Sequence, residues 1–144
     1  MKKILITGAN SYIGIRVEQY LAQWPECYQV DTVDMVDGTW RDKSFRGYDA
    51  VFHVAGLVHQ PKTKDDPAQA EKYDYVNHRL AVQTAEKAKA EGVKQFLFMS
   101  SMSVYGLAAP VGKVVTITAD TPLCPTDHYG ISKKKAEECL ASLA

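Results

Sequence analysis

Short apolar runs alternate along this chain with longer segments whose apolar residues recur at helical spacing. The first run, Ile4 to Ile6, lies between Lys3 and Thr7 and shows no polar alternation. Such a run is typical of a strand buried on both faces of a parallel sheet. From Tyr12 the apolar positions repeat at helical spacing until Pro25 ends the pattern. The N-terminal segment therefore predicts a strand, a tight turn and a helix.

The rest of the chain predicts three more strands and two more helical segments. The strands are expected at 28–33, 49–55 and 93–99. A long helix, or two helices in succession, is expected over 68–90, with Gly92 as its C-cap. The last helix is expected over 129–143, with Ile131 and Ala136 among its apolar positions. Strands and helices thus alternate along the chain.

This alternation defines the expected fold class. Parallel strands joined by helices form right-handed crossovers, so the prediction is an α/β fold with a Rossmann-type, doubly wound parallel sheet. Residues 1–144 contain no visible repeat, low-complexity tract or linker, and are expected to form one domain. Such sheets bind ligands at the carboxyl ends of their strands. Functional residues are therefore expected where each strand ends.

Composition narrows the class of protein. Apolar residues make up 46% of the chain and charged residues 24%, as in soluble globular domains. Seventeen basic residues balance seventeen acidic ones, so nucleic acid is not an expected partner. No apolar run approaches the roughly 20 residues that span a bilayer, so no membrane partner is expected. Three cysteines without paired spacing, and no secretory leader, favour the cytoplasm.

The segment between the first strand and first helix has the features of a phosphate-binding loop. Its backbone N–H groups and the positive end of the helix would face a ligand at the strand ends. Gly8 would allow the tight turn and Gly14 the close packing of the helix on the strand, whereas Ser11 stands at the usual middle glycine. The loop residues expected to bind a dinucleotide are Gly8, Asn10, Ser11, Tyr12, Ile13 and Gly14.

Asp34 strengthens the dinucleotide interpretation. It lies 20 residues after Gly14, at the expected end of the second strand, where a carboxylate accepts a hydrogen bond from a ribose 2′-hydroxyl. A 2′-phosphate would meet this carboxylate unfavourably, and Arg41 is the nearest candidate in the sequence to offset it. NAD is therefore the expected cofactor, and NADP the less favoured one.

A second group of residues has the chemistry of a proton-transfer site. Tyr129 and Lys133 are four residues apart and so lie on one face of the last helix. A nearby cation favours the phenolate form of a tyrosine, which makes it a usable general acid or base. Ser101, just past the fourth strand, could hydrogen-bond the same substrate oxygen. The catalytic candidates are Ser101, Tyr129 and Lys133.

Together these residues resemble the extended short-chain dehydrogenase/reductases, in particular their nucleotide-sugar epimerases and dehydratases. The matching segments, in order, are Thr7-Gly8 to Gly14, Asp34, His53-Val54-Ala55-Gly56, Val76-Asn77, Ser100-Ser101 to Val104-Tyr105-Gly106, and Tyr129 to Lys133. The resemblance implies that Tyr129 is the catalytic acid or base with Ser101 as its partner, and that Lys133 bridges the nicotinamide ribose hydroxyls. It also implies that the backbone of Val54, Ala55 and Gly56 lines the cofactor.

The resemblance implies a nucleotide-sugar substrate, most simply a UDP-sugar, and a 4-epimerase that transfers a hydride transiently to NAD. Dehydratases of the family carry an Asp-Glu pair where this chain has Met102 and Ser103, which disfavours dehydration. A 4-keto reductase would use the same three catalytic residues. A non-catalytic NAD-binding regulatory or scaffold module is the alternative from another class.

Length is a departure from the family, whose members have a C-terminal part that completes the sheet and binds the sugar. The 144-residue chain resembles the cofactor-binding portion, truncated before the C-terminal strands and substrate domain, and is expected to be inactive alone. Missing strands would expose apolar edge surface, so a homo-oligomer is expected.

Other reactive side chains show no functional pattern. His53, His59, His78 and His128 lack the spacing of metal ligands, so no metal site is expected. Cys124 and Cys139 have no activating neighbour in the sequence and are expected to be packing or loop residues.

Overall fold

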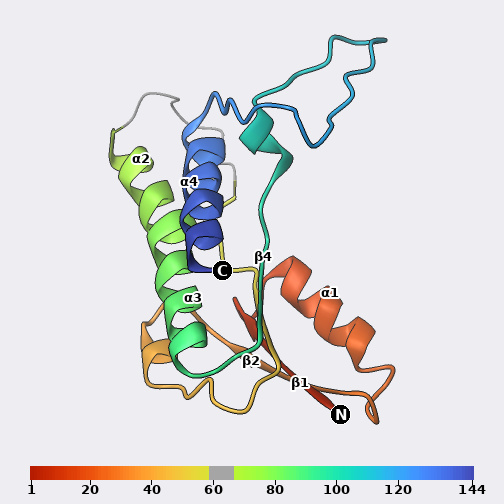
Figure 1. Ribbon diagram of the computed structural model, residues 1–144, viewed down its shortest axis with the longest axis vertical. Coiled ribbons are helices and arrows are strands. Elements are labelled where there is room, and N and C mark those ends of the chain that lie inside the picture. Colours follow the sequence, from red (N-terminus) through yellow and green to blue (C-terminus); the bar gives the residue numbers. More distant parts are fainter. Residues whose placement is uncertain (59–66) are drawn as a thin grey trace. The chain divides into compact units, whose positions relative to one another are not determined.

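A computed structural model describes residues 1–58 and 67–144 of the chain (Figure 1). The described residues form two compact units. The first unit consists of Met1–Gly56, Ala81–Met99 and Leu143. The second consists of the described residues within Leu57–Leu80, together with Ser100–Ser142 and Ala144. The first unit contains the sheet, and the second contains the C-terminal helix.

The first unit is built on a parallel sheet of four strands. They are β1 (Lys2–Thr7), β2 (Tyr28–Val33), β3 (Ala50–His53) and β4 (Gln95–Phe98). Their order is β2-β1-β3-β4, and every neighbouring pair is parallel. The chain leaves β1 toward β2 on one side and later returns to β3 on the other, so the topological switch lies between β1 and β3. This confirms the predicted parallel α/β sheet.

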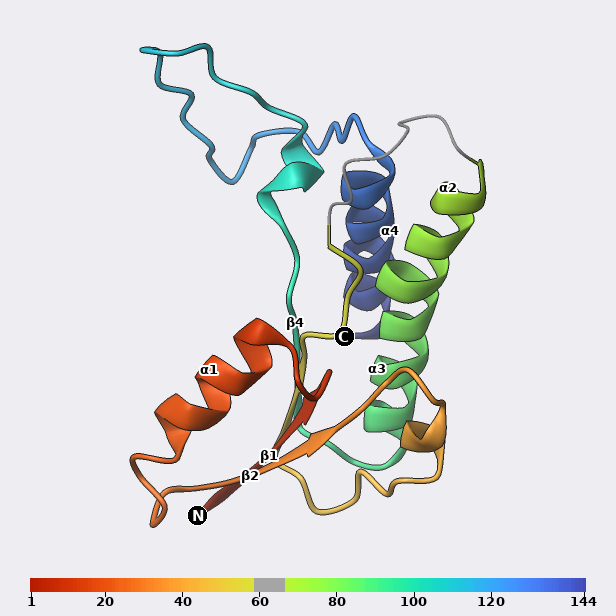
Figure 2. The same cartoon turned by 180° about the vertical axis from the view of Figure 1, so that it is seen from behind.

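Helices cover both faces of this sheet, as a doubly wound fold requires. Helix α1 (Tyr12–Leu21) lies on one face and α3 (Leu80–Ala90) on the other, as Figures 1 and 2 both show. Helix α1 ends earlier than its apolar pattern predicts, and Trp24 closes a separate turn through a hydrogen bond from its N–H to Leu21 O at 3.0 Å. The reason is Pro25, which has no N–H to donate to Leu21 O four residues earlier, so the helix cannot continue through it.

The core of the first unit follows the predicted pattern. Strand β1 is buried on both faces at its C-terminal end, where Leu5, Ile6 and Thr7 are all 0% exposed. Thr7 Oγ1 lies 2.6 Å from Nδ1 of His53, which is fully buried. The His53 ring stacks on Phe96 at 5.9 Å between ring centroids. His53 is therefore a core residue at the end of β3.

Helices form most of the second unit. Helix α2 (Pro67–Tyr73) continues into a π-helix at Asp74–Arg79, which runs directly into α3, so the segment is one continuous helical run. Helix α4 (His128–Leu143) lies alongside α2 and the π-helix in both views, and a short 3₁₀ helix occupies Met102–Tyr105 (Figures 1 and 2).

The face that α4 buries differs from the apolar pattern. Ile131 is 38% exposed, whereas Ser132 and Lys133 are 2% and 3% exposed. Ala136 is fully buried, as its pattern predicts. Helix α4 therefore buries a partly polar face, on which Ser132 has a hydrogen-bond partner in the π-helix, Asn77.

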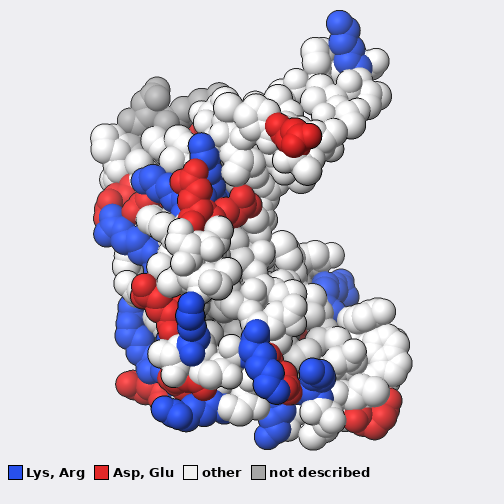
Figure 3. Space-filling view, viewed as in Figure 1, with Lys and Arg blue, Asp and Glu red and all other residues white. Residues whose placement is uncertain are grey.

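Charge is evenly distributed on the surface that can be seen. Lys, Arg, Asp and Glu atoms are interspersed on the face drawn in Figure 3, without a continuous area of one sign. Within the described ranges, no helix combines the length and apolar character needed to cross a bilayer.

Candidate functional site

Gly8 makes the turn at the carboxyl end of β1, in the first unit. Its φ of +112° lies where side chains are rarely tolerated, and a Cβ there would be 2.7 Å from Ala55 N. The N–H groups of Gly8 and Ala9 both donate to Val33 O, at 2.9 and 3.1 Å. The glycine thus lets β1 turn tightly between the ends of β2 and β3, at the topological switch where such sheets bind ligands.

Gly14 and Ser11 shape the start of α1. A Cβ on Gly14 would lie 2.7 Å from Ser11 Oγ and 3.2 Å from Gly8 O, so a side chain there would displace the Ser11 hydroxyl and crowd the turn. Ser11 is the N-cap, and its Oγ accepts a hydrogen bond from Gly14 N at 3.1 Å. Within residues 1–58 and 67–144 the Ser11 hydroxyl donates no hydrogen bond, so its proton is available to a ligand. Ser11 therefore caps the helix that the family's middle glycine would leave without a side-chain cap.

The other loop residues expected at the cofactor lie on the surface of the first unit. Asn10 has a φ of +66° and is exposed. Tyr12 and Ile13 open α1 and are 75% and 39% exposed. Their side chains are accessible, and their N–H groups belong to the first turn of the helix, where helical donors lack intrahelical partners.

Asp34 follows β2 directly, beside the Gly8 turn. Val33 O receives the Gly8 and Ala9 hydrogen bonds, which brings the end of β2 to the loop. One carboxylate oxygen of Asp34 accepts from Val36 N at 2.7 Å. Within the described ranges its other oxygen receives no hydrogen bond from the chain. The side chain is thus oriented by its own turn, with one oxygen available.

Val54, Ala55 and Gly56 continue from the carboxyl end of β3. The N–H groups of Val54 and Ala55 donate to Thr7 O at 3.0 and 2.9 Å, which holds this segment against the end of β1. Val54 is half-buried and Ala55 is buried, whereas Gly56 is exposed. The structure thus brings the glycine loop, the segment after β3 and the end of β2 together in the first unit.

The three catalytic candidates lie in the second unit. Ser101 is the N-cap of the 3₁₀ helix, and its Oγ accepts from Ser103 N at 3.2 Å. Tyr129 is in the first turn of α4, which Asp127 caps by accepting from Gly130 N at 2.7 Å. Its ring contacts that of Tyr73 edge-on, with centroids 6.1 Å apart.

Gly130 brings the Ser101 segment and α4 together, a role not anticipated from the sequence. A Cβ on this residue would lie 2.5 Å from Ser103 O and 2.8 Å from Pro125 Cβ. The first turn of α4 can therefore pack directly on the backbone that follows Ser101. The Tyr129-Gly130 dipeptide is a sequence feature that could have predicted this approach.

Lys133 is a buried cation on the same helix. It is 3% exposed, and burial lowers its pKa to about 8, although the Glu137 carboxylate acts in the opposite direction. Glu137 also accepts a short hydrogen bond from Ser100 Oγ. At neutral pH the ammonium therefore remains charged, close to the helix turn that carries Tyr129.

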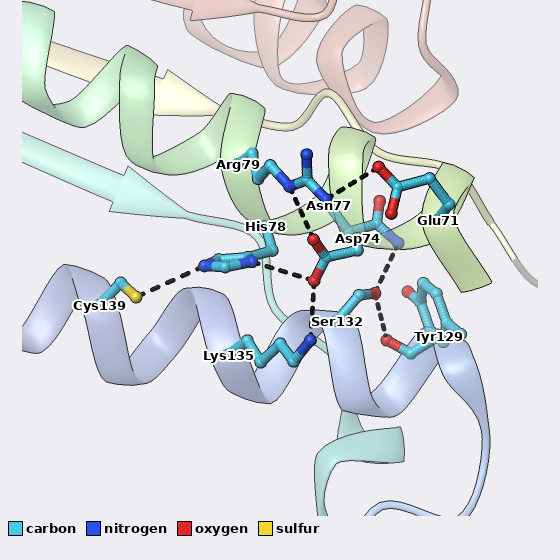
Figure 4. Close-up of polar contacts among 9 residues, drawn as sticks. All are labelled: Glu71, Asp74, Asn77, His78, Arg79, Tyr129, Ser132, Lys135 and Cys139. Carbon is cyan, nitrogen blue, oxygen red and sulfur yellow. Dashed lines mark hydrogen bonds and ion pairs between the residues drawn. The ribbon is translucent and has the colours of Figure 1, made fainter.

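Asn77 holds the backbone near Tyr129 in place. It is fully buried, and its side chain bonds both backbone groups of Leu57, accepting from N at 2.7 Å and donating to O at 3.1 Å. Its Nδ2 also donates to Ser132 Oγ at 3.2 Å, and Ser132 donates to Tyr129 O at 2.7 Å (Figure 4). Asn77 thus links the segment after Gly56 to the first turn of α4.

Among the described residues, no group of three His, Cys, Asp or Glu side chains is placed to hold a metal ion. His59 lies outside the described residues. His78 and Cys139, two of the side chains without a sequence pattern, contact each other in the second unit at 3.4 Å between Nε2 and Sγ.

The fold and these motifs define a class, the NAD dependent epimerase/dehydratase family. The family model matches residues 4–144, nearly the whole chain, and the chain belongs to this family.

Individual relatives carry related activities. The chain is 28% identical over 159 residues to a UDP-glucose 4-epimerase of Vibrio cholerae, covering 99% of this chain and 47% of the relative. It is 28% identical over 150 residues to a GDP-6-deoxy-D-mannose reductase of Pseudomonas aeruginosa, covering 96% of this chain and 46% of the relative.

Solved structures share the fold. A short-chain dehydrogenase/reductase superfamily protein from Agrobacterium tumefaciens, crystallised with bound NAD, superposes with a TM-score of 0.77 at 27% identity. The match covers 96% of this chain and 44% of that one. The chain therefore spans less than half the length of each of these relatives.

Proposed function

We propose that this chain supplies the NAD-binding and proton-transfer residues of a nucleotide-sugar 4-epimerase. The observation that carries the proposal is Lys133, a cation buried one helical turn from Tyr129 on a helix that packs against the Ser101 segment. Burying an ammonium is costly, so such a residue is expected to have a function. Family membership and the epimerase relative support the same activity.

The first unit fits a dinucleotide. Gly8 and Gly14 leave space that a Cβ would fill, and the N-terminus of α1 offers N–H groups and a positive dipole to a pyrophosphate. Asp34 offers a carboxylate oxygen to a ribose hydroxyl, which favours NAD over NADP. When bound, NAD supplies the hydride acceptor for the reaction. We assign Lys133 to the nicotinamide ribose hydroxyls, as in the family.

The catalytic residues then divide the proton chemistry among themselves. Tyr129 removes the proton of the sugar 4-hydroxyl as the hydride leaves C4, and Lys133 stabilises the negative charge of the phenolate. Ser101 donates a hydrogen bond to the same substrate oxygen. When the hydride returns to the opposite face of C4, Tyr129 gives the proton back to the oxygen. The net result is inversion at C4 with no change of oxidation state.

Two related reactions are the alternatives. A 4-keto reductase would use the same residues in one direction only, and the Pseudomonas aeruginosa relative bears the name of a reductase. Dehydration is disfavoured because Met102, 64% exposed, and Ser103 stand where a carboxylate pair would be needed. We favour a UDP-sugar as substrate because of the Vibrio cholerae relative.

Calorimetric titration of the chain with NAD and NADP tests the cofactor assignment. NAD should bind more tightly, and Asp34→Ala should weaken NAD binding by about tenfold because a charged hydrogen-bond acceptor is lost. Asp37→Ala is the matched control, since Asp37 is a nearby carboxylate that accepts from Thr39. Equal affinity for the two dinucleotides in the unaltered chain would refute the assignment.

Turnover tests the catalytic assignment. With the protein at its full natural length and UDP-glucose as substrate, Tyr129→Phe should lower epimerisation about 10³-fold and leave the Kd for NAD within about twofold. Tyr75→Phe, which alters an exposed tyrosine of the second unit, is the control. Unchanged turnover in Tyr129→Phe would contradict the mechanism. Light scattering on the same samples tests the expected homo-oligomer.

A further inference from the structure

Three side chains of the second unit form a hydrogen-bonded series between the π-helix and α4 (Figure 4). Cys139 Sγ lies 3.4 Å from Nε2 of His78, and Nδ1 of the same ring lies 3.1 Å from Asp74 Oδ1. The His78 and Asp74 side chains are 20% and 18% exposed, and Cys139 is half-buried. A thiol, an imidazole and a carboxylate are thus placed in line in a partly enclosed position.

The carboxylate at the end of this series is firmly held. Lys135 Nζ lies 2.9 Å from Asp74 Oδ1, and Arg79 Nε lies 2.8 Å from Oδ2. Burial alone would raise the pKa of Asp74, but the hydrogen bonds from Lys135, Arg79 and His78 outweigh it and lower the pKa to about 2. Asp74 is therefore ionised and fixes the orientation of the His78 ring. Glu71 completes the charged surroundings through Arg79.

A nucleophile within hydrogen-bond reach of a base, which a third group orients, is the arrangement that activates cysteine thiols. The other two cysteines lack it. Cys27 is exposed, and its thiol donates to a Glu26 carboxylate oxygen at 3.6 Å. Its hydrogen-bond partner is therefore a carboxylate and not an imidazole. Cys124 is also exposed, and no hydrogen bond reaches its sulfur from the described part of the chain. Cys139 and His78 are 61 residues apart, so no local pattern indicates their contact.

We propose that Cys139 is a reactive thiol, activated by His78 and Asp74, that forms a mixed disulfide with low-molecular-weight disulfides such as glutathione disulfide. His78 Nε2 accepts the thiol proton, and the resulting thiolate attacks one sulfur of the disulfide. A bond forms between Cys139 Sγ and that sulfur as the original sulfur–sulfur bond breaks. The leaving thiolate takes the proton from His78, so one thiol is oxidised and one is released. The inference does not depend on the cofactor or the sugar.

The alternative is that the contact only packs α4 against the π-helix, and the two interpretations predict opposite orders of reactivity. If access to solvent alone decided the rate, the half-buried Cys139 would react more slowly than the exposed Cys27 and Cys124. If His78 activates the thiol, Cys139 reacts faster than both. The two exposed cysteines are therefore controls within the same chain.

The experiment measures mixed-disulfide formation at each cysteine by peptide mass spectrometry, at pH 7 with glutathione disulfide. Cys139 should react about tenfold faster than Cys124. His78→Gln should remove this advantage, because an amide can fill the space and hydrogen-bond but cannot accept the proton. His128→Gln changes the histidine that begins α4 and should leave the rate unchanged, with circular dichroism checking the helices of both variants.

Two results would overturn the proposal. One is a Cys139 rate at or below those of Cys27 and Cys124 in the unaltered chain, a comparison that needs no variant to fold. The other is a fast Cys139 whose rate His78→Gln does not lower in a folded protein.

Discussion

The glycine loop of the first unit and the α4 region of the second are built by different means. Around Gly8 and Gly14 the geometry depends on the lack of a side chain, because a Cβ at either position would lie 2.7 Å from a neighbouring atom. Around Lys133 and Asp74 it depends on charged side chains that are buried or paired. The glycine loop depends on close packing of the backbone, whereas the α4 region depends on interactions of charged side chains.

The difference predicts two kinds of sensitivity. Adding a side chain in the loop should lower the free energy of unfolding at any pH. In α4 and the π-helix, removing a charged group should change the free energy of unfolding by an amount that depends on pH. The first unit can be followed by itself, since both tryptophans, Trp24 and Trp40, lie in it. Tryptophan fluorescence therefore reports the first unit, whereas far-UV circular dichroism reports the helices of both units.

Gly8→Ala is expected to have the largest effect. The new Cβ would meet Ala55 N at 2.7 Å, and alanine would have to adopt a φ of +112°. Overpacking and backbone strain together should lower the free energy of unfolding by about 3 kcal/mol. Urea titration followed by tryptophan fluorescence measures it.

Gly47→Ala separates the contact from the strain. Gly47 also has a positive φ, +83°, but nothing lies within 4 Å of its Cβ position. This variant should lose only about 1 kcal/mol. Equal losses in the two variants would mean that backbone conformation, and not the approach of Gly8 to Ala55, limits the loop.

Lys133→Met should act in the opposite direction and stabilise the chain. Methionine fills a similar volume without the cost of a buried charge, so the free energy of unfolding should rise by about 2 kcal/mol at pH 7. Because burial lowers the pKa of Lys133 to about 8, the cost is present in full below pH 8. It disappears as the pH rises to about 10.5, where folded and unfolded lysine are both neutral.

The measurement is urea titration by circular dichroism at pH 7 and at pH 10.5. The advantage of Lys133→Met over the unaltered chain should be largest at pH 7 and close to zero at pH 10.5. A variant less stable than the unaltered chain at pH 7 would show that contacts of the ammonium repay its burial.

Asp74→Asn tests the paired carboxylate of the π-helix. The amide keeps the shape but loses the ion pairs, so the free energy of unfolding should fall by about 1.5 kcal/mol at pH 7. Since the pKa of Asp74 is lowered to about 2, its contribution is complete above pH 4 and is lost as the pH falls through 2. The two proteins should therefore converge in acid titrations, and a constant difference from pH 7 to pH 2 would contradict the electrostatic origin.

The contrast between the regions also explains what the sequence could predict. The buried strands follow from apolar runs, and the loop follows from Gly8 and Gly14, because backbone requirements leave a local pattern. Gly92 likewise adopts the predicted C-cap, with a φ of +81°. The start of α1 after Ser11 is confirmed for the same reason.

The buried polar side chains of the second unit leave no such local pattern in the sequence. Periodicity assigns polar residues to solvent, yet Asn77 and Ser132 are buried, because each finds its partner 55 residues away in the chain. The π-helix is also invisible to a pattern of helical spacing. Asp74 and Arg79 are five positions apart in the sequence, and the wider turn of the π-helix brings them to ion-pair distance. Tertiary partners, and not local preference, decide these positions.

Substitutions of Ser11 should have small effects, down to a few tenths of a kcal/mol, and they test whether the loop uses any side chain at all. Ser11 Oγ accepts from Gly14 N at 3.1 Å, so its loss leaves one helical N–H without its cap and should cost about 1 kcal/mol. Ser11→Gly, which restores the family's glycine, should cost only a few tenths of a kcal/mol, since glycine is itself tolerated at N-caps. Both are measured by urea titration with tryptophan fluorescence. If both variants are as stable as the unaltered chain, the hydroxyl contributes nothing and the loop is held by backbone alone. If only Ser11→Ala is less stable, the serine cap and a glycine are equivalent at this position.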